Sequence, residues 1–291
     1  MIKKKLKKNA VKVDKFLINY LKKQKQSLLV KPMKYGIISG GKKIRSTIIF
    51  DVGKIFNLSE KKLINICAAV ECIHSYSLIH DDLPCMDNDI MRRGKPSTHI
   101  KFGEASAVLA GSSLLTLAFE IITDKKYLLK NKMKNEIIKS LASCSGHTGI
   151  AGGQELDLKF ENKKKKINQI INMQKKKTGK LFNFCLYAVG VIANKTKKEK
   201  KILSNLGEEI GLLFQLADDF LDKKGTKNLV GKPVKKDNKK GKSTLLKLMG
   251  EKKAYLYGNN LKKKILRKLE KHGKKANELS STIKFILERK F

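Results

Sequence analysis

The most informative stretch of the sequence covers residues 77–89 and reads Ser77-Leu78-Ile79-His80-Asp81-Asp82-Leu83-Pro84-Cys85-Met86-Asp87-Asn88-Asp89. It follows a largely apolar segment, residues 66–79, which we expect to be helical. The proline disfavours helical geometry in the residue before it, so this helix should end or kink near Leu83. Asp87 can then fold back toward Asp81. A straight helix would prevent this, because six residues span about one and two-thirds turns.

A second acidic cluster lies in another apolar helical pattern and reads Gln215-Leu216-Ala217-Asp218-Asp219-Phe220-Leu221-Asp222. Asp218 and Asp222 are four residues apart and Gln215 precedes Asp218 by three, so a helix places all three on one face. Either cluster alone could equally be a capped helix end or a solvated acidic face. Two clusters in apolar helices of one Lys-rich chain instead predict paired carboxylate sites. Such sites suit Mg²⁺, which is usually shared between a few carboxylates and substrate phosphates.

Apolar residues recur at helical spacing over most of the chain. The predicted helices cover about 9–24, 46–56, 60–82, 105–123, 131–149, 167–192 and 199–222, and a last group runs from about 242 onward. No period-two alternation flanked by hairpin signals occurs, so no strand is expected. No internal repeat is visible, and only 223–241 has a loop-like composition. The prediction is an all-α fold, a single-domain bundle spanning residues 1–291.

The charge of the chain is strongly unbalanced, with 65 Lys or Arg against 26 Asp or Glu and a formal net charge of +39. Such an excess suggests a basic nucleic-acid-binding protein, because cations release counterions from a phosphate backbone. Only 5 of the basic residues are Arg, however, whereas nucleic-acid readers usually exploit the bidentate guanidinium. The lysines are scattered along the whole chain, which favours solvated helix surfaces. No nucleic-acid partner is therefore expected.

The chain shows no signs of export or membrane insertion. No window contains 18 uncharged apolar residues, and the N-terminus lacks the apolar region of a secretory signal. We therefore expect no stable membrane insertion and a cytoplasmic protein. The cysteines are odd in number and form no C-x-x-C pair, which predicts free thiols rather than disulfides or structural zinc: Cys67, Cys72, Cys85, Cys144 and Cys185.

Three groups of residues could supply positive charge to a substrate diphosphate. The segment Gly40-Gly41-Lys42-Lys43-Ile44-Arg45 precedes an apolar helix, so its amides and cations suit an anion. Arg92-Arg93-Gly94-Lys95-Pro96 directly follows the first acidic cluster. His74 lies two helical turns before Asp81 and projects from the same face, although a lone His in an apolar helix is more often a core residue. Residues 241–244, Gly-Lys-Ser-Thr, resemble the end of a P-loop, but the first Gly of that motif is replaced by Lys236.

Taken together, these motifs resemble the trans-prenyltransferases of the polyprenyl synthase family over about 35–244, most densely over 68–111. The resemblance implies a bundle of long helices around a deep central cavity, usually homodimeric, with the two acidic clusters on opposite walls. It implies a transferase that condenses isopentenyl diphosphate head-to-tail with dimethylallyl and geranyl diphosphate to give (2E,6E)-farnesyl diphosphate. It also implies three Mg²⁺ ions held by Asp81, Asp82, Asp87 and Asp218, with Asp219 and Asp222 in support.

The same resemblance assigns roles to the other residues of the site. Isopentenyl diphosphate is expected on Lys42, Arg45, His74 and Arg93, and the allylic diphosphate on Arg92, Lys177 and Lys232. Lys177, Thr178 and Gln215 match catalytic positions that face the reacting carbons. Tyr76 and Ser77, together with the two-residue insertion 84–85, go with the fifteen-carbon product. The segment 223–241 is expected to act as a lid that excludes water.

Some positions depart from the family pattern, and some alternatives stay open. Ser46, Asn88, Ile90 and Leu246 replace residues common in close relatives. A geranyl or geranylgeranyl diphosphate synthase of the same fold would carry the same motifs. A terpene cyclase has no use for the cations of a second diphosphate. A non-catalytic subunit or a nucleic-acid binder is disfavoured by the intact acidic clusters, since carboxylates repel phosphates unless a metal intervenes.

Overall fold

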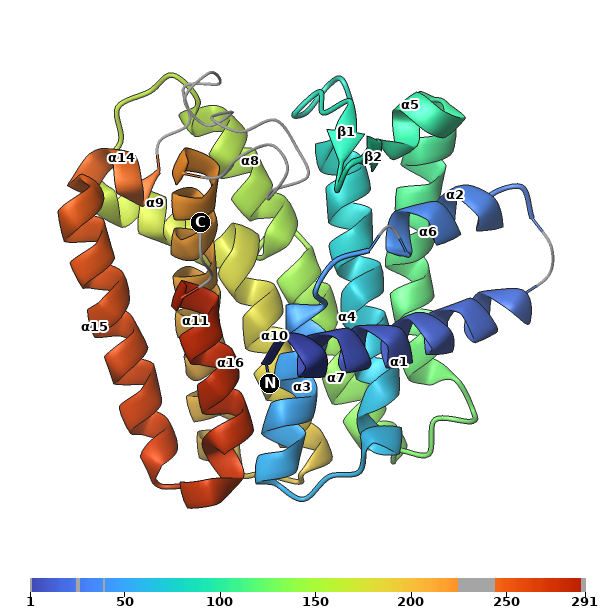
Figure 1. The fold of residues 1–291 in the computed structure, drawn as a ribbon. Helices are drawn as coiled ribbons and strands as arrows, with labels where there is room; N and C mark the ends of the chain where they lie inside the picture. Colours follow the sequence, from blue (N-terminus) through green and yellow to red (C-terminus); the bar gives the residue numbers. More distant parts are fainter. Residues whose placement is uncertain (1, 25–26, 39, 225–243, 289–291) are drawn as a thin grey trace.

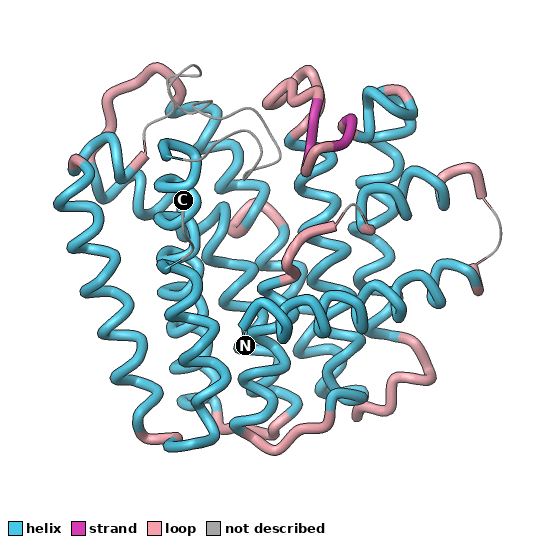
Figure 2. Tube along the Cα trace, in the orientation of Figure 1, coloured by secondary structure: helices cyan, strands magenta, loops and turns pink. Residues whose placement is uncertain are grey.

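The computed structural model describes residues 2–24, 27–38, 40–224 and 244–288 (Figure 1). The elements in chain order are α1 (Ile2–Lys22), α2 (Val30–Ile37), α3 (Ile44–Ile55), α4 (Glu60–Asp81), β1 (Met91–Arg92), β2 (Lys95–Pro96), α5 (Thr98–Phe102), α6 (Glu104–Thr123), α7 (Asn131–Ser145), α8 (Ile150–Phe160), α9 (Ile167–Gln174), the π-helical turn η1 (Lys175–Gly179), α10 (Lys180–Ile192), α11 (Lys197–Lys224), α14 (Leu245–Met249), α15 (Glu251–Glu270), the 3₁₀ turn η2 (Gly273–Ala276) and α16 (Asn277–Glu288). The tube in Figure 2 shows that helices make up nearly all of the described chain. The all-α prediction is confirmed.

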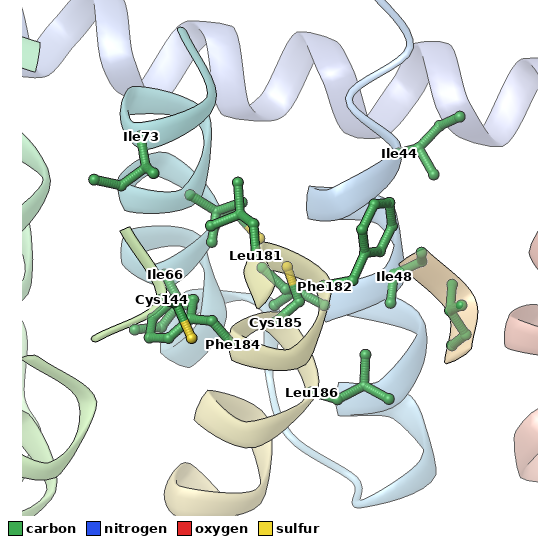
Figure 3. Close-up of a cluster of buried hydrophobic side chains, with 14 of the residues drawn as sticks. Ile44, Ile48, Ile66, Ile73, Cys144, Leu181, Phe182, Phe184, Cys185 and Leu186 are labelled. Carbon is green, nitrogen blue, oxygen red and sulfur yellow. The ribbon is translucent and has the colours of Figure 1, made fainter. Parts of the chain in front are cut away.

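The core lies where α3, α4, α10 and α11 pack together, with α6 and α7 on one side and α15 and α16 on the other. Figure 3 shows its centre, a cluster that includes Phe182 and Phe184 of α10, Ile48 of α3 and Ile66 of α4. These four side chains are fully buried. All five cysteines are free thiols, as predicted, and only Cys85 is exposed.

Three short helices were not predicted from the sequence: α2, α5 and α8. In α8 the cause is the pair Gly152 and Gly153, which weakens the helical signal. The structure explains the second glycine, because a Cβ there would lie 2.1 Å from the backbone nitrogen of Lys177. Glycine is therefore required for the close approach of α8 to η1.

A two-stranded hairpin, β1–β2, also departs from the prediction of no strands. Met91 pairs with Pro96 and Arg92 with Lys95. The turn residues Arg93 and Gly94 both have positive φ, 54° and 75°, as a tight hairpin turn requires. Arg is uncommon in this conformation, so the hairpin turn could not be recognised from the residue types. The hairpin positions Arg92 and Arg93 at the end of α4.

Two helices, α4 and α6, are long and apolar enough to cross a membrane by length and composition alone. In α4, 72% of the apolar window is buried inside the bundle, as expected of a core helix. In α6 only 44% is buried, and Val108 and Leu109 are 41% and 54% exposed. One face of α6 is therefore an apolar surface on the outside of the described structure.

The N- and C-terminal helices are joined through α3. Lys5 of α1 donates to both carboxylate oxygens of Asp51, at 3.0 and 3.1 Å, and to the hydroxyl of Thr282 in α16 at 2.8 Å. Asp51 is 1% exposed, and its pKa is raised because burial outweighs the nearby Lys5 cation. This cluster fixes α16 against the helix that follows the 40–45 segment.

Candidate active site

A cavity of about 550 Å³ runs into the bundle between α3, α4, α8, η1 and α11. Its walls carry Asp81 and Asp87 from the first acidic cluster and Asp218, Asp219 and Asp222 from the second. The cations predicted for diphosphate binding also line it: Lys42, Arg45, His74, Arg92, Arg93 and Lys177. Two acidic groups 130 residues apart in sequence therefore share one cavity with the cations. The deep central cavity expected of the fold is present.

The first acidic cluster folds as the sequence predicted. α4 ends at Asp81, and the chain turns back so that the amide of Asp87 donates to the carbonyl of Asp81 at 2.8 Å. Asp82 faces another way. It is 2% exposed, does not line the cavity in the described chain, and receives Nε of Arg92 on both carboxylate oxygens at 3.0 and 3.1 Å. Burial raises the pKa of Asp82, although Arg92 opposes the shift. Its geometry is that of a residue that orients Arg92, and its part in metal binding stays a prediction.

The second acidic cluster is anchored by amides. Asp219 is 4% exposed and accepts hydrogen bonds from Gln174 at 3.2 Å and from Gln215 at 3.0 Å. The amide oxygen of Gln215 accepts in turn from the hydroxyl of Thr178 at 2.8 Å. Thr178 lies in the π-helical turn, so this chain of hydrogen bonds ties η1 to α11.

The acidic side chains suit a hard cation that also takes ligands from a substrate. Every candidate ligand is a carboxylate oxygen, the donor that Mg²⁺ prefers. Within the described residues, no three His, Cys, Asp or Glu side chains converge into a ready-made metal site. This fits an ion that completes its coordination with phosphate oxygens and water rather than one enclosed by protein alone.

The two neighbouring lysines of the 40–45 segment point to different environments. Lys42 is exposed at the cavity, with its ammonium 5.6 Å from the centroid of the Phe285 ring. Lys43 has a left-handed backbone, and its side chain is 3% exposed. Its ammonium lies 3.2 Å from Asp14 and 3.9 Å from Glu71, and it donates to the carbonyl of Ile37 at 3.1 Å. Lys42 was predicted from the sequence as a diphosphate ligand, whereas the buried contacts of Lys43 were not predicted.

Arg45, the next cation of that segment, lies against aromatic rings. Its guanidinium is 4.7 Å from the ring centroid of Phe182 and 5.5 Å from that of Phe214. Glu71 lines the cavity nearby, is 3% exposed and accepts from the hydroxyl of Ser46 at 2.7 Å. Ser46, one of the departures from the family pattern, therefore has a structural role as a donor to Glu71. Burial lowers the pKa of Arg45, and the Glu71 carboxylate opposes the shift.

His74 is kept neutral by its surroundings. Burial holds its pKa well below the usual value, and the cations of Arg45 and Arg93 lower it further. Arg93 donates to the carbonyl of Gly40. Gly41 has a φ of 111°, a backbone conformation that other residues rarely adopt, and the guanidinium of Arg93 lies against it. Neutral His74 can offer one N–H donor to a substrate phosphate without adding charge.

The π-helical turn brings Lys177 to the cavity, where its ammonium lies 2.6 Å from Asp157 of α8. Asp157, Gln154 and Glu71 line the cavity but were missed from the sequence. The available signal was the same as for the acidic clusters, namely polar side chains inside otherwise apolar helices. In α8 the unrecognised helix hid that signal.

The two residues predicted to set product length differ in position. Ser77 lines the cavity one turn before Asp81. Tyr76 is not among the cavity-lining residues of the described chain, and its ring packs edge-on against His80 with centroids 5.4 Å apart. The predicted diphosphate ligand Lys232 and the predicted lid from 225 to 241 lie outside the described residues.

The remaining departures from the family pattern lie around this site. Asn88 adopts a positive φ of 49° in the loop after α4, a conformation that Asn tolerates better than most residues. Ile90 is 59% exposed, and Leu246 is buried in α14. None of the three lines the cavity.

Fold and site together define a helical bundle with a cavity that is lined by two acidic clusters and several cations. Comparison with known proteins gives the family. Residues 26–285 match the model of the Polyprenyl synthetase family, and the chain belongs to that family. It is 41% identical to the farnesyl diphosphate synthase of Bacillus subtilis over 228 residues, 77% of each chain.

Solved structures agree with this assignment. An FPP/GFPP synthase from Zymomonas mobilis superposes with a TM-score of 0.88 at 35% identity, covering 98% of both chains. A geranyltransferase from Helicobacter pylori, solved with magnesium and isoprenyl diphosphate, superposes with a TM-score of 0.82 at 30% identity over 98% of this chain and 97% of that one.

Proposed function

We propose that the protein is a prenyltransferase that makes farnesyl diphosphate from isopentenyl diphosphate and the allylic dimethylallyl and geranyl diphosphates. The observation that carries the proposal is the shared cavity, which is lined by carboxylates of both acidic clusters and by six Lys and Arg side chains. The farnesyl diphosphate synthase relative supports the activity.

The acidic clusters are the proposed site for three Mg²⁺ ions, held by Asp81, Asp82, Asp87 and Asp218, with Asp219 and Asp222 in support. Bound there, magnesium would neutralise the charge that builds on the departing diphosphate. Arg92 and Lys177 are proposed to bind the same diphosphate; Arg92 is oriented by Asp82 and Lys177 by Asp157. Lys232 joins them in the proposal.

The second diphosphate belongs to isopentenyl diphosphate and is proposed to lie on Lys42, Arg45, His74 and Arg93. The negative charges of Glu71, which acts on Arg45 and Arg93, and of Asp14, which acts on Arg93, limit the mutual repulsion of these cations. The aromatic rings beside Arg45 exclude water, which strengthens the attraction of its guanidinium for phosphate.

Reaction begins when the C1–O bond of the allylic substrate breaks and the electron pair leaves with the diphosphate. Lys177, Thr178 and Gln215 are proposed to face the resulting cation, which is supported by their shared position in the cavity lining and by the hydrogen bond from Thr178 to Gln215. The double bond of isopentenyl diphosphate attacks C1, and a proton is lost from the adduct. No described side chain in the cavity is placed as an obvious base for that carbon, so the departing diphosphate is the proposed acceptor.

A product length of fifteen carbons is also part of the proposal. Ser77 lines the cavity, which supports a role in limiting the product to fifteen carbons, and Tyr76, the residue before it, packs against His80. A geranylgeranyl or geranyl diphosphate synthase is the alternative, since both use the same diphosphate machinery.

We also propose a homodimer formed through α6. From Ala105 to Phe119 this helix carries no charged residue, in a chain of which 31% is charged. Its exposed Val108 and Leu109 form an apolar face without like-charge repulsion between two copies.

The cytoplasm, where charged diphosphates are made and used, is the proposed location.

The test is an assay with isopentenyl diphosphate and each allylic primer, with and without Mg²⁺, scored by released pyrophosphate and by product chain length. Farnesyl diphosphate formed only with Mg²⁺ is the expected result. Magnesium-independent turnover, or binding of oligonucleotides without pyrophosphate release, would contradict the proposal.

Size measurement at micromolar concentration, with Leu109→Lys as the disrupting variant, tests the dimer.

A further inference from the structure

Gln154 is a buried polar residue for which the protein itself provides no partner. It lies in α8, is 6% exposed and lines the cavity. Among the residues that the structure describes, neither its amide nitrogen nor its amide oxygen has a hydrogen-bond partner. A buried amide without a partner destabilises the folded protein, whereas an apolar side chain of the same size would not. The residue is therefore better explained by a ligand than by folding.

Gln154 lies at the depth in the cavity where the reacting carbons of an allylic diphosphate are expected. Figures 1 and 2 show that the C-terminal ends of α4, α8 and α11 lie at the same end of the bundle. Gln154 precedes Asp157 by three residues, as Gln215 precedes Asp218. At ~1.5 Å per residue, the backbone of each glutamine lies about 4.5 Å further into the bundle along its helix than the aspartate that follows it. C1 of an allylic diphosphate is bonded directly to the diphosphate, so in the proposed binding mode C1 lies in the layer of these two amides, below the aspartates.

Thr178 and Gln215 in that layer already have partners. The hydroxyl of Thr178 donates to the amide oxygen of Gln215 at 2.8 Å, and the amide nitrogen of Gln215 donates to Asp219 at 3.0 Å. Gln174 keeps an unpartnered amide oxygen, but its nitrogen donates to Asp219, whereas in Gln154 both ends of the amide are without a partner in the described chain. Because Gly153 packs against the backbone of Lys177, α8 is fixed against η1 before substrate binds. Such preorganised dipoles are effective because they need not reorient during reaction.

We propose that Gln154 is a further catalytic residue whose amide oxygen faces the allyl unit and stabilises the positive charge formed on ionisation. The C1–O bond breaks, its electron pair leaves with the diphosphate, and the charge is shared between C1 and C3. The oxygen stabilises this charge through its dipole and forms no bond to carbon. The inference deepens the proposed function and rests on it.

The test uses Gln154→Leu, which keeps the size of the side chain and removes the dipole. Three quantities are measured: the single-turnover condensation rate, the affinity for an allylic thiolodiphosphate that cannot readily ionise, and the melting temperature. We expect the rate to fall roughly 100-fold, the range seen when one preorganised dipole is removed. The affinity for the analogue should change less than about threefold. The melting temperature should stay level or rise, because an orphaned amide is removed.

A rate within about threefold of wild type would overturn the inference. So would a loss of analogue affinity equal to the loss of rate, since it would make Gln154 a ground-state contact to diphosphate. A lower melting temperature would also overturn it, because Gln154 would then have a structural partner. Gln154→Met should reproduce the pattern of Gln154→Leu.

A matched control is Asn65→Leu in α4. Asn65 is also a buried amide, 8% exposed, but it donates to the carbonyl of Ile121 at 3.1 Å and does not line the cavity in the described chain. This variant should lower the melting temperature and leave the condensation rate unchanged. Wild-type protein that condenses no allylic diphosphate would overturn the proposed function itself. Active wild type with a fully active Gln154→Leu would overturn the role of Gln154 alone.

Discussion

Replacing Lys43 by Met should destabilise the protein, although its neighbour Lys42 tolerates the same change. The Lys43 ammonium lies 3.2 Å from Asp14 and 3.9 Å from Glu71, and its side chain is 3% exposed. Removing one partner of a fully buried ion pair costs about 3–5 kcal/mol. Asp14 is 25% exposed and Glu71 keeps the hydroxyl of Ser46, so the expected loss is about 2–4 kcal/mol. Urea unfolding should show this as a lower midpoint with an unchanged slope.

The same substitution should weaken isopentenyl diphosphate binding indirectly. Lys43 holds the 40–45 segment between α1 and α4, and that segment carries the predicted phosphate ligands Lys42 and Arg45. We expect the KM for isopentenyl diphosphate to rise roughly tenfold, equivalent to about 1.4 kcal/mol of lost positioning.

Lys42→Met is the matched control because it removes an equal charge one residue away. Lys42 is exposed at the cavity, so its loss should change stability by less than about 0.5 kcal/mol while raising the same KM. The reasoning is refuted if Lys43→Met unfolds at the wild-type midpoint. It is equally refuted if Lys42→Met is the destabilised variant. Asp14→Asn combined with Lys43→Met should be less destabilising than the sum of the single changes, because both act on one contact.

Three further predictions concern product length, His74 and the joint between the terminal helices. Ser77→Phe should shorten the product by filling the cavity one turn below Asp81, and Tyr76→Ala should lengthen it; chromatography of the products decides both. His74→Gln should keep the KM for isopentenyl diphosphate within about threefold, since a neutral donor replaces a neutral donor, whereas a protonated His74 would show a large increase. Because the folded-state pKa of His74 lies below the ordinary value near 6.5, the unfolded chain binds that proton first as pH falls. Wild type should therefore lose stability below about pH 6.5. Between pH 7.5 and pH 5.5, the free energy of unfolding measured in urea should fall by less for His74→Gln than for wild type. Lys5→Met should cost about 2–4 kcal/mol in the same assay without changing either KM, because Asp51 would stay buried without its ammonium.

The acidic clusters could be located from sequence because each rests on local rules. Pro84 ends α4, and the observed hydrogen bond from Asp87 to Asp81 is the fold-back that the proline predicts. Asp218, Asp222 and Gln215 share a face because α11 is a regular helix through all three. Spacing alone was sufficient for these residues.

Residues whose roles depend on tertiary contacts could not be found in the same way. Lys42 and Lys43 are identical in type and adjacent in sequence, and only the presence of Asp14 and Glu71 distinguishes them. Asp82 and Asp81 are likewise adjacent, yet one binds Arg92 and the other lines the cavity. Gln154 was hidden because the glycines of α8 argued against a helix, and their reason is the close approach to η1.

The charges around the cavity are paired, although the chain as a whole carries a large positive net charge. Around the cavity, cations are matched on the protein side by carboxylates: Arg92 by Asp82, Lys177 by Asp157, and Lys43 by Asp14 and Glu71. A bare cluster of cations would repel itself in a low-dielectric interior, so these carboxylates let the cations gather before any diphosphate arrives. Asp157 and Glu71 line the cavity themselves, whereas Asp82 and Asp14 do not in the described chain. The +39 excess is then a property of the outer surface, where water and salt screen it, and not of the site that gives the protein its chemistry.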